Sequence, residues 1–211
     1  MTKPARLFLI VLSLSFASPR AHAEPKFIPE TLSVYLGGGK NPMNSRGHSV
    51  FRSIQFEVSG HSPRIAKWLG PKMETGMALK YSDVRQARSW FGYSYGEPDD
   101  SVRAESAFFF LRRGLGSRFY GELGTGPMWS NRRVPAATSR LNFESQAGLG
   151  VNLGSSGRFP LRLGYRFSHI SNAGLASRNP GLNVHSFMIG TRVRTFRPRD
   201  HVANPRSSTR P

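Results

Sequence analysis

Hydrophobic and polar residues alternate along short segments of this chain, which is the pattern of half-buried β-strands rather than of helices. Gly, Pro, Asn and Ser separate the segments, and no run has the pattern of a long amphipathic helix. This spacing predicts one all-β domain, either a sandwich or a barrel. The predicted strands cover residues 32–37, 50–59, 73–82, 103–112, 118–126, 141–153, 160–168 and 183–196, with a weaker ninth over residues 89–95.

The two faces of these strands differ in a way that favours a membrane barrel. In residues 141–153, Leu141 and Phe143 lie on the apolar face, whereas Glu144 and Gln146 lie on the opposite face. Across the strands the second face gathers glycines, amides and the ions Glu57, Glu74, Lys80, Glu122, Glu144, Arg162 and Arg166. Paired ions suit a narrow lumen and apolar side chains suit lipid. We therefore expect an eight-stranded antiparallel transmembrane β-barrel of the bacterial outer membrane.

The alternation of side chains along a strand does not by itself show which face lies inside the barrel. A soluble periplasmic barrel with an internal lipid pocket is therefore the alternative. The turn lengths favour the membrane barrel. With both ends in the periplasm, the outer turns cover roughly residues 38–49, 83–102, 127–140 and 172–182. The short turns 113–117 and 154–159 fit the periplasmic side, whereas the segment 60–72 is longer than expected there.

The N-terminal segment 1–23 has the features of a secretory signal peptide. Lys3 and Arg6 form a basic start, residues 7–16 are largely apolar, and Ala21 and Ala23 supply a small-x-small cleavage site. An apolar run of this length is too short to span a membrane as a helix. We expect residues 24–196 to form the barrel and residues 197–211, rich in Arg, Pro and Ser, to form a disordered tail.

The charge of the chain indicates an anionic partner. Its net charge is +18, and the exported part keeps +15 because the signal holds three of the 30 basic residues and none of the 12 acids. For an exported protein we expect a phosphate-rich lipid surface rather than nucleic acid. The chain has no cysteine, which excludes disulfides and thiolate chemistry. No motif for a metal or an organic cofactor is present.

His169 and Ser171 are the candidates for chemistry. Side chains alternate along a strand, so these two point the same way with Cα atoms roughly 6.5–7 Å apart. Tyr165 and Phe167 share their face, so the pair lies on an apolar surface. A general base beside a hydroxyl on such a surface suggests an esterase with a lipid substrate. The plainer interpretation is that both are ordinary polar residues near a strand end.

Two segments carry a resemblance to a known family, residues 169–174 (His-Ile-Ser-Asn-Ala-Gly) and residues 179–183 (Asn-Pro-Gly-Leu-Asn). They resemble the signature of the PagL-type lipid A 3-O-deacylases. The resemblance implies an eight-stranded outer-membrane barrel that hydrolyses the acyl ester at the 3 position of lipid A without a cofactor. It also implies Ser171 as nucleophile, His169 as general base, and Asn172 with the backbone amide of Gly174 as oxyanion donors.

One position departs from the family pattern. The family has a glutamate fourteen residues after the histidine, where this chain has Asn183. An asparagine can accept a hydrogen bond from the imidazole but brings no charge to stabilise an imidazolium. An acid from another outer turn could replace it, and the candidates are Asp83, Glu97, Asp99 and Asp100. The alternative to an enzyme is a non-catalytic barrel that binds lipopolysaccharide or has a structural or adhesive role. His185 shares the face of Asn183, as a polar helper or as an interfacial histidine.

The expected partners are lipid A within lipopolysaccharide and outer-membrane lipid. Basic residues in the predicted outer turns could bind the phosphates of lipid A. They are Lys40, Arg46, Arg85, Arg88, Arg132, Arg133, Arg140 and Arg178. A homodimer is one arrangement that the sequence leaves open.

Overall fold

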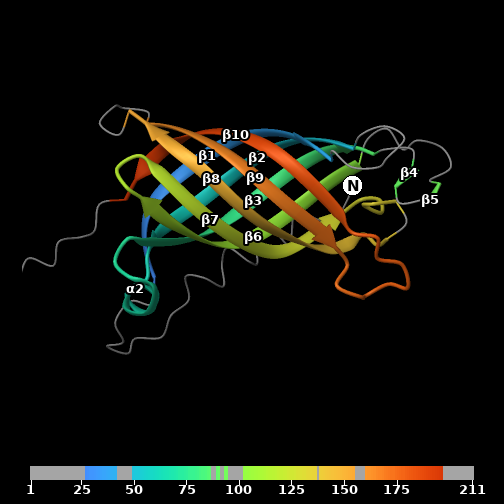
Figure 1. Ribbon diagram of the computed structural model, residues 1–211, viewed down its shortest axis with the longest axis horizontal. Helices are drawn as coiled ribbons and strands as arrows, with labels where there is room; N and C mark the ends of the chain where they lie inside the picture. Colours follow the sequence, from blue (N-terminus) through green and yellow to red (C-terminus); the bar gives the residue numbers. More distant parts are fainter. Residues whose placement is uncertain are drawn as a thin grey trace, which may run out of the picture.

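Eight long strands close into an antiparallel β-barrel (Figure 1). The computed structural model describes residues 27–41, 49–86, 89–90, 93–94, 102–136, 138–154 and 160–196. Around the barrel the strands follow the order β1-β10-β9-β8-β7-β6-β3-β2, so each pairs with its neighbours in the chain and β1 closes on β10. Their bounds are β1 Ile28–Lys40, β2 Val50–His61, β3 Met73–Arg85, β6 Val102–Leu115, β7 Phe119–Ser130, β8 Leu141–Leu153, β9 Leu161–Ser171 and β10 Leu182–Thr195.

This architecture confirms the predicted fold and strand order. β8 has the predicted bounds, and β1, β3, β6, β7 and β9 extend further toward the outer end of the barrel than the sequence pattern indicated. The weak ninth segment is a separate two-stranded sheet, β4 (Ser89–Trp90) with β5 (Tyr93–Ser94), and does not join the barrel. In the described part of the chain, no helix has the length and apolar character needed to cross a membrane.

Burial along the strands shows which face is inside. In β6, Phe108 and Phe110 are each 1% exposed, whereas Phe109 between them is 48% exposed. In β8, Glu144 is 1% exposed and the adjacent Phe143 is 38% exposed. The acids and amides therefore fill the lumen, and the apolar side chains form the outer surface. This is the arrangement of a transmembrane barrel, and it rules out the soluble barrel with an apolar internal pocket.

Arg112 of β6 is the centre of the ion network in the lumen. Its guanidinium contacts Glu57 Oε2 and Glu122 Oε2, both at 2.8 Å from Nη2, and lies 3.5 Å from Glu74. Arg166 of β9 contacts the other oxygen of Glu57 at 2.9 Å and also bonds Glu122. Each buried cation thus meets at least two carboxylates, which offsets the cost of removing the ions from water. The sequence pattern predicted the other four residues, but Arg112 was missed.

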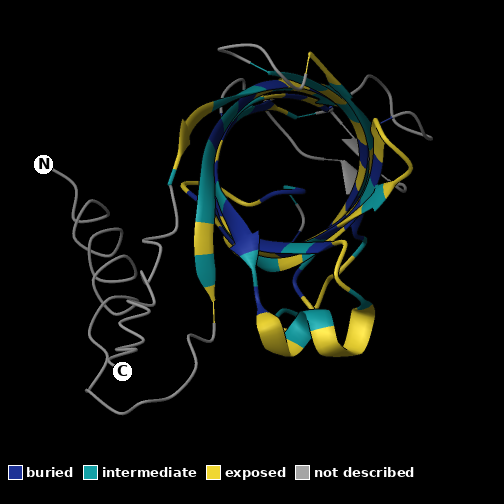
Figure 2. Ribbon diagram, turned by 90° about the vertical axis from the view of Figure 1, so that its left-hand side faces the viewer, coloured by how far each residue is buried: buried dark blue, intermediate teal, exposed yellow. Residues whose placement is uncertain are grey.

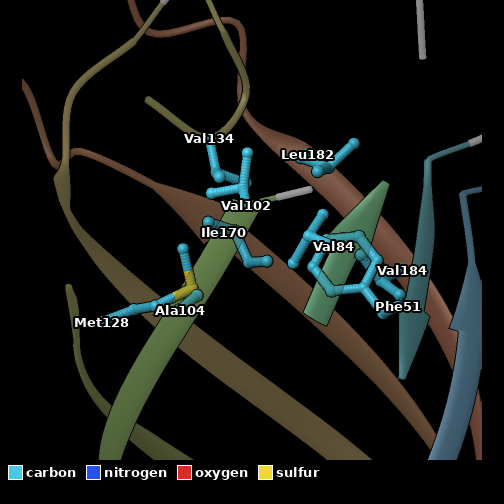
Figure 3. Close-up of a cluster of buried hydrophobic side chains, with 9 residues drawn as sticks. All are labelled: Phe51, Val84, Val102, Ala104, Met128, Val134, Ile170, Leu182 and Val184. Carbon is cyan, nitrogen blue, oxygen red and sulfur yellow. The ribbon is translucent and has the colours of Figure 1, made fainter. Parts of the chain in front are cut away.

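The outer end of the lumen is apolar instead (Figure 3). Ile170 of β9 and Leu182 and Val184 of β10 project inward and are at most 2% exposed. This apolar plug consists of Phe51, Val84, Val102, Ala104, Met128, Val134, Ile170, Leu182 and Val184. Because side chains alternate, the plug fixes the inner faces of the two strand ends whose outer faces carry the candidate site.

A short helix, α2 (Pro63–Leu69), accounts for the unexpectedly long turn between β2 and β3. Pro63 begins the helix and Gly70, with φ +94°, ends it. Proline is favoured at the first position of a helix and glycine just after the last one. The turn lies at the end of the barrel where β1 begins and β10 ends. Seen along the barrel axis, α2 sits outside the ring of strands and does not cover the lumen (Figure 2).

The predicted signal peptide, residues 1–23, and the predicted tail, residues 197–211, lie outside the described residues. Both stay predictions.

Candidate functional site

The candidate site lies at the end of the barrel opposite α2, where β9 ends and β10 begins (Figure 1). His169 is exposed on the outer surface, whereas Ser168 and Ile170 on either side are buried in the lumen. Ser171 has the same parity as His169 and is half-buried. The alternation predicted from the sequence is therefore present, and the imidazole and hydroxyl share the outward face.

Asn183 lies directly across from His169 in the antiparallel register of β9 and β10. His169 Nδ1 is 2.7 Å from Asn183 Oδ1. A carboxamide oxygen only accepts hydrogen bonds, so Nδ1 carries the proton and donates it. The neutral ring then keeps its lone pair on Nε2, the tautomer that a general base needs.

Ser171 pairs across the strands with Phe143 of β8. Its Cα lies roughly 6.5–7 Å from that of His169, as two residues along a strand require. No hydrogen bond joins the Ser171 hydroxyl to the His169 ring among the described side chains. Catalytic hydrogen bonds are often long without substrate and tighten when substrate binds, so the spacing is compatible with a base and nucleophile pair.

The loop 172–181 after β9 is organised by two asparagines. Asn172 is fully buried, and its Nδ2 donates to the carbonyl of Arg178 at 2.8 Å. Its Oδ1 accepts the Gly174 N–H at 2.9 Å, and its own backbone N–H donates to Asn179 Oδ1 at 3.1 Å. Asn172 therefore shapes the loop from within, and its amide does not reach the surface. The two residues expected to be oxyanion donors are bonded to each other.

Three residues of this loop have a positive φ angle, and one of them is not a glycine. Ala173 is the non-glycine residue with positive φ in the described chain, at +50°, and Gly174 and Gly181 follow at +82° and +65°. Gly181 also packs against the imidazole, because a Cβ at this position would lie 2.9 Å from His169 Cε1. Left-handed conformations of this kind often occur at functional sites, where the surrounding structure holds them.

A row of polar side chains crosses the outer surface at the level of His169. Ser145 of β8 pairs with His169, and Thr125 of β7 pairs with Ser145, their hydroxyls 2.9 Å apart. Together with Asn183 the row covers four neighbouring strands. Sequence reasoning missed Thr125 and Ser145. The signal was available, since Ser145 interrupts the otherwise apolar face of β8.

His185 lies on the same outward face of β10 as Asn183. Its Nδ1 is hydrogen-bonded to the Tyr165 hydroxyl, and its ring lies edge-on to Phe167 with centroids 5.2 Å apart. These aromatic contacts suit an interfacial histidine. Of the candidates for a replacement acid, Asp83 lies on β3, four strands from β9 in either direction. Glu97, Asp99 and Asp100 lie outside the described residues.

Two apolar grooves run over the outer surface below the site. One, of about 660 Å³, includes Gly121, Ala147 and Phe167, and Phe167 lies two residues from His169 on the same face. The other, of about 730 Å³, includes Gly150, Gly164 and Phe187. Both reach Leu149 and Tyr165, so they meet on β8 and β9. In the first groove Gly121 and Ala147 are small residues on the outward face, whereas Gly150 and Gly164 of the second have the parity of the lumen face.

Exposed cations surround the same end of the barrel. Lys40 ends β1, Arg85 ends β3 and Arg140 precedes β8, all three exposed. Arg132, Arg133 and Arg178 are exposed in the turns at this end. The other two predicted cations, Arg46 and Arg88, lie outside the described residues.

Comparison with known proteins assigns the chain to a protein family. The model of the lipid A 3-O-deacylase (PagL) family matches residues 73–192, from the start of β3 into β10. The chain belongs to the PagL family. The match covers β9, the loop after it and the start of β10, so it includes His169, Ser171 and Asn183.

A curated relative agrees with this assignment, and a solved structure has the same fold. The lipid A deacylase PagL of Bordetella bronchiseptica is 36% identical over 104 residues, which are 44% of this chain and 54% of that protein. The chain thus matches about half the length of this relative. The crystal structure of the outer membrane enzyme PagL has the same fold, with a TM-score of 0.51 over 75% of this chain and 97% of that chain at 17% identity. The protein is an outer-membrane β-barrel.

Proposed function

We propose that this barrel is a lipid A deacylase that hydrolyses an ester-linked acyl chain, at the 3 position, by a serine mechanism. The observation that carries the proposal is the hydrogen bond between His169 Nδ1 and Asn183 Oδ1, with Ser171 on the same outward face. The family supports the reaction class, because the matched family model is that of the lipid A 3-O-deacylases.

In this mechanism His169 Nε2 takes the proton of the Ser171 hydroxyl as its oxygen attacks the ester carbonyl. The C–O bond to the sugar then breaks, and the imidazolium returns the proton to the leaving sugar oxygen. Water, deprotonated by the same imidazole, hydrolyses the acyl-serine and releases the fatty acid. Asn183 holds the ring in the required tautomer throughout, but supplies no charge to the imidazolium.

The tetrahedral intermediate needs donors aimed at its oxyanion. Our candidates remain Gly174 and Asn172, with different tasks. The Gly174 N–H would donate directly by exchanging its bond to Asn172 Oδ1 for the oxyanion. Asn172, buried and bonded to the Arg178 carbonyl, would hold that segment of the loop in place. The strained backbone at Ala173 supports this assignment.

The surroundings of the site suit lipid A as the substrate. The groove that reaches Phe167 offers an acyl chain an apolar path down the outer wall from the level of His169. The hydroxyls of Thr125 and Ser145 face a layer where lipid tails offer no hydrogen-bond partner, whereas an ester or a sugar does. The cations at the outer rim suit the phosphates of the headgroup.

Mass spectrometry of lipid A tests the proposal. The protein is expressed in a host whose lipid A keeps its 3-linked acyl chains, next to the Ser171→Ala variant at the same level in the outer membrane. We expect loss of one ester-linked chain with the intact protein and none with the variant. Unchanged lipid A in the presence of properly inserted intact protein would refute the proposed deacylase activity.

That negative result would favour a non-catalytic barrel that binds lipopolysaccharide. The observation in its favour is Asn183, an amide where the family has an acid. A homodimer is a separate prediction, which cross-linking in the membrane would test.

A further inference from the structure

Helix α2 packs only partly against the described part of the barrel. It is seven residues long and contains no buried residue. Isolated helices shorter than about 12–15 residues are marginal in water, and in proteins most helical stability comes from packing an apolar face. Ile65 is half-buried, but Trp68 is 87% exposed and Leu69 is 43% exposed, so these two side chains leave much of their apolar surface uncovered by the described residues.

The position of α2 places these side chains next to the lipid-facing wall. The helix lies outside the ring of strands, at the end where the chain enters and leaves the barrel (Figure 2). Leu69 lines the apolar groove together with Leu111 and Leu123 of the outer surface. The apolar side of α2 is therefore continuous with the surface that contacts the membrane core.

The polar residues of α2 are all basic. Arg64 and Lys67 are exposed on the helix, and Lys72 is exposed just before β3. The first turn contains no acid, and Lys67 lies in the last turn. A tryptophan beside lysine and arginine is the composition of segments that lie at a membrane interface, where anionic headgroups attract the cations.

We propose that α2 is a membrane foot that binds anionic phospholipid of the periplasmic leaflet. Trp68 and Leu69 enter the boundary between headgroups and acyl chains, and Arg64, Lys67 and Lys72 bind the phosphates. The foot fixes the depth of the barrel from the leaflet opposite the candidate site. The inference rests on the outer-membrane fold and not on any catalytic activity.

Fluorescence of Trp68 tests the foot. The chain has three tryptophans, so Trp90→Phe and Trp129→Phe leave Trp68 as the single reporter. The full-length protein is inserted into phosphatidylcholine vesicles with an increasing fraction of phosphatidylglycerol. We expect emission to shift to shorter wavelength as that fraction rises, and lipid brominated near the headgroup to quench it. Emission typical of water without quenching in every vesicle would overturn the proposal.

A matched pair of variants separates local binding from general charge. Arg64→Gln with Lys67→Gln removes two exposed cations of α2, and Arg52→Gln with Arg103→Gln removes two exposed cations at the other end. We expect the α2 pair to lower the equilibrium constant for binding of α2 to the phosphatidylglycerol surface, obtained from the emission shift, about fivefold per cation and roughly 25-fold in all. The distant pair should leave it unchanged. An equal loss in both pairs would contradict a specific foot.

Discussion

His169 Nδ1 lies 2.7 Å from Asn183 Oδ1, and the two residues face each other directly across β9 and β10. The contact is the one that an acid would make at this position, with an amide oxygen in place of a carboxylate. It orients the ring and selects a tautomer, but leaves the imidazolium without a counter-charge. Orientation and charge are thus separable at this site, and substitutions of Asn183 can measure each.

Restoring the acid should speed hydrolysis. We expect Asn183→Glu to raise kcat of deacylation between about 10-fold and 10⁴-fold, the upper figure being the cost of the acid-to-amide change in a serine-protease triad. The measurement is the rate of fatty-acid release from purified lipopolysaccharide. Asn183→Leu, similar in size but unable to accept a hydrogen bond, should be slower than the parent. Equal or lower activity of Asn183→Glu would mean that another group already supplies the charge.

Gly181 should be sensitive because of its contact with the imidazole. In Gly181→Ala the new Cβ meets His169 Cε1 at 2.9 Å, so the ring must move. A displacement of about 1 Å in a catalytic group can cost about 100-fold in rate, and we expect a loss of that order in kcat. Gly154→Ala is the control, because φ is +69° there and a Cβ would meet nothing within 4 Å. Both variants carry similar backbone strain, so equal activity in the two would contradict the role of the contact.

Narrowing the acyl groove should select against long chains. Ala147 lines the groove beside Phe167, its partner across the strands, and its side chain is exposed. We expect Ala147→Trp to lower kcat/KM about tenfold or more for long-chain esters. The loss should be much smaller for short-chain esters, because a short acyl chain makes little contact with the groove at Ala147. Met77→Trp adds the same side chain to the outer surface of β3 and serves as the control. If both variants show the same chain-length profile, the acyl chain lies elsewhere.

Removing Arg112 should destabilise the barrel strongly. Its guanidinium is 2% exposed and contacts Glu57, Glu122 and Glu74. Arg112→Met therefore leaves the buried carboxylates of Glu57 and Glu122 with Arg166 as their remaining cation. Breaking a buried ion pair in this way costs about 3–5 kcal/mol. The loss is measured as the change in the free energy of unfolding, obtained by urea titration of the protein in detergent micelles or lipid vesicles. Arg113→Met changes the next residue, which is exposed on the outer surface, and should have little effect.

The sequence by itself determined the strands and the parity of the site. A period of two is a local property, so alternation alone put His169 and Ser171 on one face and Ile170 on the other. The spacing of strands and turns likewise gave the eight-stranded order and placed Asn183 beside His169. The one short motif within this pattern was enough to suggest the family to which the chain belongs.

Only the tertiary structure decided which contacts these residues make. Closing the barrel joined Arg112 to acids on other strands, and it brought Thr125 and Ser145 level with His169. It also buried the Asn172 amide, which the sequence suggested as a direct donor. The sequence did not predict α2, because a helix of seven residues is too short to show a helical repeat of apolar positions. Such contacts depend on residues far apart in the chain, and a local pattern carries no information about their distance in space.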